Sequence, residues 1–318
     1  MNEIRLTSEK RLRIFTGRAH PELAEGVAAE LGIPITPTSA YDFANGEVFV
    51  RFEESVRGSD AFVIQSHAAP VNKQIMEQLI MVDALKRASA KRITVVTPFY
   101  GYARQDKKHR GREPISARLM ADLFKTAGAD RLMVVDLHTS QIQGFFDIPV
   151  DHLESNTVFY PYIENLRLDS LTFASPDVGS TNRARQYAQH FNCEMVICDK
   201  HRKRANEIAS MTLIGDVTDR NVILVDDICD TAGTLCNAAK LIMDKGAKSV
   251  RAMITHPVLS GKAYENIEAS LLAELVVCNT IPLKKESKKI TVLSVADLFA
   301  SAIRNCYEQR SISSLFVK

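Results

Sequence analysis

The stretch from Val222 to Thr234 joins a strand, an acidic pair and a loop of small residues that opens a helix. Its first residues, Val222 to Val225, are all aliphatic, and such a run is typical of a parallel strand with both faces covered. The following helix is predicted from Leu235 to Asp244. A strand, loop and helix in this order favour an α/β fold.

The loop after this strand has the chemistry of a phosphate site. Successive backbone N–H groups can face an anion at the positive end of the helix, and two threonines add hydroxyl groups. These residues are Asp230, Thr231, Ala232, Gly233 and Thr234. Asp226 and Asp227 would repel a phosphate, but they can accept hydrogen bonds from a ribose diol or hold a cation. An ordinary turn with a helix cap is the alternative, but a cap needs only one such side chain, so we interpret the segment as a phosphorylated-sugar site.

The same segment, VILVDDICDTAGT, resembles the motif that binds phosphoribosyl diphosphate (PRPP) in type I phosphoribosyltransferases and PRPP synthetases. The resemblance implies that Asp226, Asp227 and the loop Asp230–Thr234 bind ribose 5-phosphate. Other segments have to distinguish between the two groups of enzymes.

Composition excludes several classes of protein. The chain has 318 residues, 46% of them apolar and 25% charged, which is ordinary for a globular protein with room for two domains. A net charge of +2 gives no strong attraction to nucleic acid or membranes. The N-terminus has no apolar signal segment and no apolar run approaches bilayer length, so we expect a cytoplasmic protein. The six cysteines form no CxxC pair and are expected to be free thiols.

The sequence contains an internal repeat. Leu79–Tyr100 and Leu241–Leu259 each run from a helix through an Ala-Lys step into an apolar strand. They lie about 160 residues apart, which predicts two domains of similar build rather than a many-unit solenoid. We place the domains at 1–154 and 155–318, with the last ~15 residues packing on the first domain.

Strands and helices alternate in both halves, which predicts largely parallel sheets flanked by helices. Further strands are expected at Arg13–Thr16, Ala61–Gln65, Leu132–Leu137, Leu171–Ala174 and Met195–Cys198. Helices are expected at Pro21–Leu31, Ile75–Ser89, Ser116–Ala127 and Asn182–His190. Ligands of such sheets bind beyond the carboxyl ends of strands, where the acidic loop lies.

A second segment, Pro98–Leu119, is rich in Lys and Arg and contains two glycines. A mobile basic loop of this kind suits a polyphosphate, whereas most basic runs are only solvated surface. Tyr100 and Gln105 are interleaved with the charges, which favours the binding role. The segment resembles the flexible catalytic loop and ATP site of PRPP synthetases, in which the Arg-Gln pair, here Arg104 and Gln105, contacts ATP. Ordinary phosphoribosyltransferases lack it.

A third segment, FANGE, has Asn-Gly near its tip and by itself predicts a hairpin turn. By resemblance, this loop contacts the adenine and ribose of ATP through Phe43, Asn45, Gly46 and Glu47. Many relatives have Asp where this chain has Asn45, and a neutral amide can still hydrogen-bond a base edge.

Two other strand ends carry candidate metal ligands. The run LMVVDLH ends in Asp136 and His138, and Ser-Pro-Asp177 follows the strand that ends at Ala174. A lone histidine is more often structural, but the resemblance implies that His138 and Asp177 help to hold Mg²⁺, which the triphosphate of ATP completes. Asp136 is expected to support the site without binding the metal.

Fixed positive charge is expected from Lys200 and Arg202, because the resemblance places the catalytic Lys-x-Arg pair of the family there, and Arg202 is also implied to bind ribose 5-phosphate. Three positions depart from the family. His201 stands between the pair where the family has Arg, Ser140 stands where an acidic residue is common, and Ser180 replaces a glycine. If that glycine has a positive φ, Ser180 would strain the loop.

The resemblance to the ribose-phosphate diphosphokinase family runs over nearly the whole chain. In its phosphate-activated class it implies a regulatory site for inorganic phosphate or ADP between subunits, and a homohexamer built from dimers. The residues implied for that site are Ser55, Arg57, Ser311, Ser313 and Phe316.

The expected reaction is transfer of the diphosphoryl group of ATP to the anomeric hydroxyl of ribose 5-phosphate, giving PRPP and AMP with the aid of Mg²⁺. No nucleic-acid or membrane partner is expected. The alternatives are a phosphoribosyltransferase that consumes PRPP and an inactive regulatory subunit associated with PRPP synthetase. The length, the repeat and the basic loop disfavour the first alternative, and Lys200 with Arg202 disfavours the second.

Overall fold

The computed structural model describes residues 11–201 and 210–316. The chain forms two compact units, each built around a sheet of mainly parallel strands, so the predicted α/β class is confirmed. Unit 1 comprises Met1–Glu154 and Val295–Lys318, and unit 2 comprises Ser155–Ser294.

The described sheet of unit 1 has five parallel strands in the order β1-β4-β5-β6-β7. These strands are β1 (Leu12–Thr16), β4 (Asp60–Ile64), β5 (Arg92–Thr97), β6 (Arg131–Val135) and β7 (Val150–Leu153). Its helices are α1 (Pro21–Leu31), α2 (Val71–Arg87), α3 (Ser116–Ala127), α8 (Ala296–Glu308) and the short η1 (Ser140–Phe145) and η2 (Ser313–Leu315). A separate hairpin consists of β2 (Thr38–Asp42) and β3 (Val48–Phe52).

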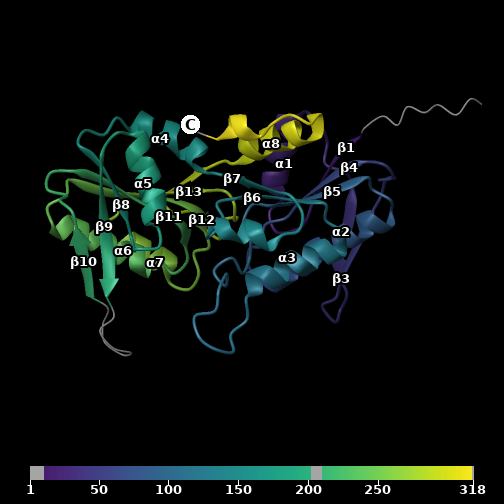
Figure 1. Ribbon diagram of the computed structural model, residues 1–318, viewed down its shortest axis with the longest axis horizontal. Coiled ribbons are helices and arrows are strands. Elements are labelled where there is room, and N and C mark those ends of the chain that lie inside the picture. The colour runs from purple at the N-terminus through teal and green to yellow at the C-terminus, as the bar shows by residue number, and fades with distance from the viewer. Residues whose placement is uncertain (1–10, 202–209, 317–318) are drawn as a thin grey trace, which may run out of the picture. The chain divides into compact units, whose positions relative to one another are not determined.

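The core of unit 1 lies on both faces of this sheet. Figure 1 shows α1 and α8 on one side of the strands and α2 and α3 on the other. Val63, Val95 and Val134 on the central strands are completely buried, which explains why these strands are aliphatic at successive positions.

The described sheet of unit 2 has the order β10-β9-β8-β11-β12-β13-β14, and only β10 runs antiparallel to its neighbour. The strands are β8 (Leu171–Ser175), β9 (Glu194–His201), β10 (Ser210–Ile214), β11 (Asn221–Cys229), β12 (Ser249–Pro257), β13 (Glu274–Cys278) and β14 (Ile290–Leu293). The helices are α4 (Asn156–Leu166), α5 (Thr181–His190), α6 (Gly233–Asp244) and α7 (Ala263–Ala269). Figure 1 shows α4 and α5 on one side of this sheet and α6 and α7 on the other.

The two units repeat one topology, because β8-β11-β12-β13-β14 follows the same spatial order as β1-β4-β5-β6-β7. In each half of the chain, however, the helix after the last strand joins the other unit. Helix α4 follows β7 but packs in unit 2, where the ring of Tyr160 stacks on His190 of α5 at 3.9 Å. Helix α8 follows β14 but packs on α1, so closely that a Cβ on Gly26 would lie 3.2 Å from that of Ala296.

The observed units keep the predicted boundary between residues 154 and 155 but differ from the prediction nearer residue 318. Only the last ~15 residues were expected to pack on the first domain, whereas the chain from Val295 onward belongs to unit 1. The reason is that the apolar face of α8, which includes Phe299 and Ile303, is buried against α1. Local sequence patterns show that this face is apolar but not which helix covers it.

Most predicted elements are present within a few residues of their expected bounds. Helices α1 and α3 have the predicted limits, and α1 ends where Gly32 adopts a left-handed φ of 70°. The described cysteines are all free, as expected. None of the helices in the described part of the chain has the length and apolar character needed to cross a lipid bilayer.

Candidate active site

The acidic pair of unit 2 lies inside strand β11. The prediction that the strand stops at Val225 was wrong, because β11 stays paired with β12 as far as Cys229. Asp227 is only 6% exposed and Asp226 is half-buried. The sheet therefore fixes the backbone of both carboxylic acids.

Asp226 is an unusually weak acid. Burial, followed by the nearby charge of Asp227, raises the pKa of Asp226 to about 8. Its Oδ1 atom accepts a hydrogen bond from the backbone N–H of Asp227 at 2.9 Å and another from the hydroxyl of Ser180. The pair therefore retains a proton at neutral pH, and a bound cation or further donors would favour its ionised form.

The loop after the pair turns sharply into helix α6. Ala232 has a left-handed φ of 61°, and the helix begins at Gly233, two residues earlier than predicted. A Cβ on Gly233 would meet no heavy atom nearer than Thr231 Oγ1 at 3.9 Å, so there is open space beside the turn. The first N–H groups of a helix have no acceptor within it and lie at its positive end, which makes this turn suitable for an anion.

Two side chains hold this loop in place. The hydroxyl of Ser260 donates a hydrogen bond to Asp230, and the amide of Asn266 donates one to the Thr231 carbonyl at 2.9 Å. Both residues come from the segment after β12, the strand next to β11. The sequence analysis did not identify either residue, although Ser260 follows a strand's carboxyl end, where ligands of parallel sheets bind.

Asp177 and Ser180 lie beyond the end of the neighbouring strand, β8. The backbone N–H of Ser180 donates a hydrogen bond to Asp177 Oδ1 at 3.2 Å. Ser180 has a φ of −90°, an ordinary conformation for any residue, so the strain considered for a serine at this position does not arise. Ser180 therefore connects Asp177, which follows β8, with Asp226 of β11.

The predicted catalytic cations are only partly described. Lys200 is the next-to-last residue of β9, where its backbone pairs with Met211 of β10. Arg202 lies outside the described residues.

In unit 1, the FANGE segment forms the predicted hairpin turn between β2 and β3. The Phe43 carbonyl accepts the Gly46 N–H at 2.8 Å, and Gly46 has a φ of 88° that suits glycine. The Asn45 side chain accepts the Glu47 N–H at 3.2 Å. The ring of Phe43 is 47% exposed and packs edge-on against Tyr41, so an aromatic surface faces outward.

The base of the basic loop is anchored at two points. Ser116 donates a hydrogen bond to the Gln105 side chain at 2.6 Å, and Thr139 after β6 donates one to Asp106 at 2.9 Å. Arg104 and Gln105 are both exposed. The segment with the Arg-Gln pair is therefore held beside the strand end that carries His138.

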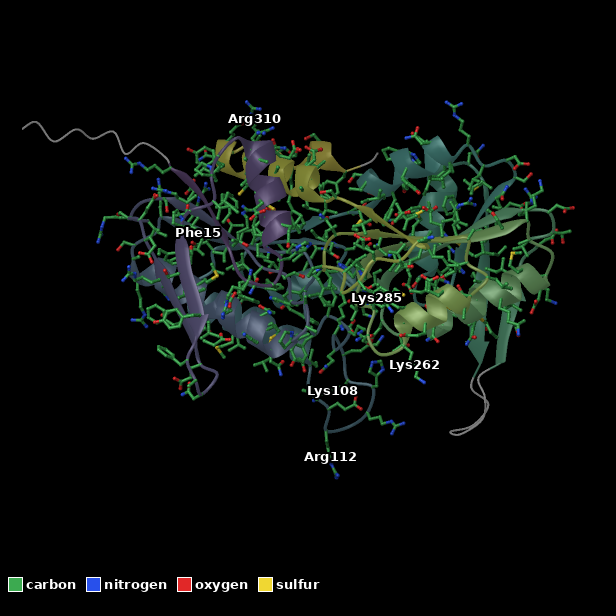
Figure 2. All side chains as sticks on the ribbon, turned by 180° about the vertical axis from the view of Figure 1, so that it is seen from behind. Phe15, Lys108, Arg112, Lys262, Lys285 and Arg310 are labelled. Atoms are coloured by element: carbon green, nitrogen blue, oxygen red, sulfur yellow. The ribbon has the colours of Figure 1, made fainter. Side chains whose placement is uncertain are left out.

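The tip of this loop has no regular secondary structure. The carboxylate of Glu113 accepts the backbone N–H groups of His109 and Arg110 at 2.8 and 3.0 Å, which lowers its pKa. Figure 2 shows Lys108 and Arg112 at the outer part of the loop, with Arg112 pointing away from the ribbon. The tip thus presents positive charge to solvent.

Asp136 and His138 both follow strand β6, but they differ in exposure to solvent. Asp136 is 3% exposed with a φ of 42°, a region that Asp adopts more readily than most residues, whereas His138 is exposed. His138 belongs to unit 1 and Asp177 to unit 2. Residues 11–201 and 210–316 contain no cluster of three or more His, Cys, Asp or Glu side chains arranged to hold a metal ion.

The residues considered for the regulatory site all belong to unit 1. Ser55 and Arg57 are exposed on either side of the buried Val56. At the other end of the chain, the Ser311 carbonyl accepts a hydrogen bond from Asn305 at 3.2 Å, and Ser311 Oγ accepts the Ser313 N–H at 3.1 Å. Phe316 follows as the last described residue and is half-buried.

The fold and the acidic loop define an α/β protein of the type I phosphoribosyltransferase-like class. The family model for the N-terminal domain of ribose phosphate pyrophosphokinase matches residues 12–128, and the model for the phosphoribosyl synthetase-associated domain matches residues 201–317. The chain belongs to the ribose-phosphate pyrophosphokinase family.

Relatives match over their full length. A ribose-phosphate pyrophosphokinase of Streptomyces coelicolor is 53% identical over 99% of both chains, and one of Wolinella succinogenes is 53% identical over 96% of this chain and 99% of the relative. The crystal structure of phosphoribosylpyrophosphate synthetase from Mycobacterium smegmatis is 51% identical, with a TM-score of 0.91 over 94% of this chain and all of that one. The family predicted from the sequence is confirmed.

Proposed function

We propose that the two units divide the substrates between them, with ATP on unit 1 and ribose 5-phosphate on unit 2. The chain transfers the diphosphoryl group of ATP to ribose 5-phosphate and so forms PRPP and AMP. One observation carries the assignment of the sugar. The acidic pair of β11 directly precedes a left-handed Ala232 and the first turn of α6, so groups for a diol and for a phosphate follow each other in the chain.

On unit 2, the 5-phosphate would bind the N–H groups and hydroxyls of the loop from Asp230 to Thr234. The ribose hydroxyls would donate hydrogen bonds to Asp226 and Asp227. Support comes from the open space beside Gly233 and from the acceptor oxygens of the pair. Arg202 is proposed as a further contact to the sugar phosphate.

On unit 1, the exposed ring of Phe43 would stack on adenine, since an aromatic face fits any base. Asn45, Gly46 and Glu47 would contact the base edge and ribose of ATP. Arg104 and Gln105 would contact its phosphates, because both are exposed on a loop whose base is anchored by hydrogen bonds.

The reaction needs positive charge near the transferred group. The anomeric hydroxyl attacks the β-phosphorus and AMP leaves, so negative charge shifts among phosphate oxygens, and Lys200 and Arg202 would stabilise it.

Mg²⁺ would supply further neutralisation of the triphosphate when bound. The carboxylate of Asp177 suits Mg²⁺, which prefers oxygen and retains water ligands, and His138 is proposed as a second ligand. The exposed position of His138 is compatible with an ion that is completed by phosphate and water oxygens.

Regulation and assembly are proposed from family membership. Phosphate and ADP would bind Ser55, Arg57, Ser311, Ser313 and Phe316, and the chain would form a homohexamer. Light scattering with and without phosphate and ADP tests the assembly. A cytoplasmic location stays a prediction.

AMP release from Mg-ATP tests the reaction. The expected result is AMP formation that depends on ribose 5-phosphate. Turnover of PRPP with a base instead would favour a phosphoribosyltransferase, and no AMP under any condition would favour an inactive regulatory subunit.

A further inference from the structure

Ser180 lies at a junction between two strand ends of unit 2. It is the residue before helix α5, in the turn that follows β8, and β8 is paired with β11. Its backbone conformation is unstrained, so nothing about the turn itself requires a serine. Backbone conformation therefore does not explain the hydroxyl group at position 180, and its contacts have to.

That hydroxyl contacts the acidic pair. Ser180 Oγ donates a hydrogen bond to Asp226 Oδ1 and lies 3.5 Å from Asp177 Oδ1, while the Ser180 N–H binds Asp177 at 3.2 Å. A serine hydroxyl has one hydrogen to donate, and the shorter contact assigns it to Asp226. A glycine or alanine could make the backbone contact to Asp177 but not the contact to Asp226.

The contact determines how Asp226 can receive a ligand. Asp226 Oδ1 already accepts the Asp227 N–H at 2.9 Å, so the hydroxyl of Ser180 is its second donor. Two donors, one on its own strand and one from the neighbouring strand end, hold Oδ1 and so restrict the rotation of the carboxyl group. Oδ2 accepts neither of these two hydrogen bonds and is the oxygen through which Asp226 would accept a sugar hydroxyl.

We propose that Ser180 is a positioning residue that sets sugar specificity, because its hydroxyl holds Asp226 in the orientation that accepts a hydrogen bond from the ribose diol. This inference rests on the proposed binding of ribose 5-phosphate to Asp226 and Asp227. A sugar phosphate that lacks one hydroxyl of the diol gains less from this orientation. Ser180 therefore favours ribose 5-phosphate over 2-deoxyribose 5-phosphate.

The test measures KM for ribose 5-phosphate and the competitive inhibition constant of 2-deoxyribose 5-phosphate in Ser180→Ala. We expect KM to rise about 10-fold, the size of one hydrogen bond, and the inhibition constant to rise less than about 3-fold. Ser180→Thr retains a hydroxyl and should restore the wild-type ratio of the two constants. Ser180→Gly provides a second hydroxyl deletion if the alanine variant folds poorly.

Thr181→Ala is the matched control, because Thr181 in the same turn donates its hydroxyl to the Val178 carbonyl at 2.8 Å instead. It should leave both constants unchanged. Equal increases of both constants in Ser180→Ala, or none, would overturn the specificity role.

Asp226→Asn separates this inference from the proposed function. If KM for ribose 5-phosphate is unchanged in Asp226→Asn, the assignment of the sugar to the acidic pair fails and the inference fails with it. If Asp226→Asn raises KM but Ser180→Ala does not change the ratio, only the role of Ser180 is wrong.

Discussion

Strand β4 of unit 1 and strand β11 of unit 2 occupy the same place in two sheets of the same order, yet their ends differ in kind. In the last part of β11, paired carboxylic acids precede an open turn. After β4, Gln65 and His67 are buried and bound to polar side chains of α2, the helix that follows. The first strand end is filled by side chains of its own unit, whereas the second adjoins a turn with open space beside it.

The network after β4 is complete within unit 1. The Gln65 amide donates hydrogen bonds to Gln74 and Glu77 at 3.0 Å, and His67 Nε2 lies 2.9 Å from Gln78 Oε1. The backbone of Arg18 also donates to Glu77, at 2.6 Å. Because buried polar groups with partners stabilise one arrangement, the strand end after β4 stabilises the fold, whereas the end of β11 is the one that we propose binds the sugar phosphate.

The largest expected effect is a loss of catalytic turnover, and it tests the proposed role of unit 2 in the reaction. Lys200→Ala should lower turnover by at least ~100-fold without changing the melting temperature, because it removes a fixed cation from the transition state. Lys248→Ala is the control, since Lys248 forms only an exposed ion pair with Asp169 in the same unit. Wild-type turnover in Lys200→Ala would refute the role.

Gly17→Ala tests the closed strand end. A Cβ on Gly17 would lie 2.3 Å from the buried side chain of Gln65, so the substitution should displace the network and destabilise the protein by about 2 kcal/mol, measured by chemical unfolding. Gly233→Ala at the open strand end has room for its Cβ and should change stability by less than about 0.5 kcal/mol. If the two variants are equally stable, the contrast between a closed strand end in unit 1 and an open one in unit 2 is wrong.

Asp226→Asn tests the raised pKa of this carboxyl group. The native pKa of Asp226 is raised to about 8 from an ordinary 3.8, so the native state resists its ionisation and wild-type stability falls as pH rises between these values. The asparagine variant should therefore gain a few degrees in melting temperature relative to wild type at pH 8, and less at pH 4.5. If the difference in melting temperature between the variant and wild type is independent of pH, the raised pKa of Asp226 is contradicted.

In unit 1, the buried ring of His67 predicts that stability falls as pH falls, which is the opposite trend. Burial lowers the pKa of His67 to about 4 from 6.5, so the native state requires the neutral ring and stability is lost as pH falls from 6.5 toward 4. By pH 5.5 this amounts to about 1 kcal/mol. His67→Gln should be less stable at every pH but have a shallower acid slope, and an unchanged slope would assign the acid sensitivity elsewhere.

Much of this fold could be predicted from the sequence, because apolar runs and helix punctuation are local signals. Helices α1 and α3 have the predicted bounds, whereas β11 was predicted too short because Asp226 and Asp227 interrupt its apolar run. An apolar run reports burial of side chains, but the strand continues wherever its backbone is paired. The predicted boundary already placed α4 in the second domain, as observed. The sequence assigned only the last ~15 residues to the first domain and not the whole of α8, because the packing of that helix depends on contacts between distant segments.

In the candidate active site, too, contacts between distant segments could not be predicted from the sequence. Residue types alone indicated that Asp226, Asp227 and the following loop bind a sugar phosphate, and family resemblance supplied the other proposed contacts. The hydrogen bond from Ser180 to Asp226 joins positions 46 residues apart and exists only because β8 and β11 are neighbours. The sequence therefore marked Ser180 as a departure from the family without showing what its hydroxyl contacts.

The position of α8 also determines the order in which the protein can be completed during synthesis. Domains usually fold as units while the chain leaves the ribosome, N-terminal part first. Here the helix that covers α1 follows unit 2 in the chain, so the apolar face of α1 is covered only after unit 2 has been made. Unit 2 ends at Ser294, so all of its residues have been made before α8 is translated. Unit 2 can therefore complete its fold before unit 1, although its translation starts later.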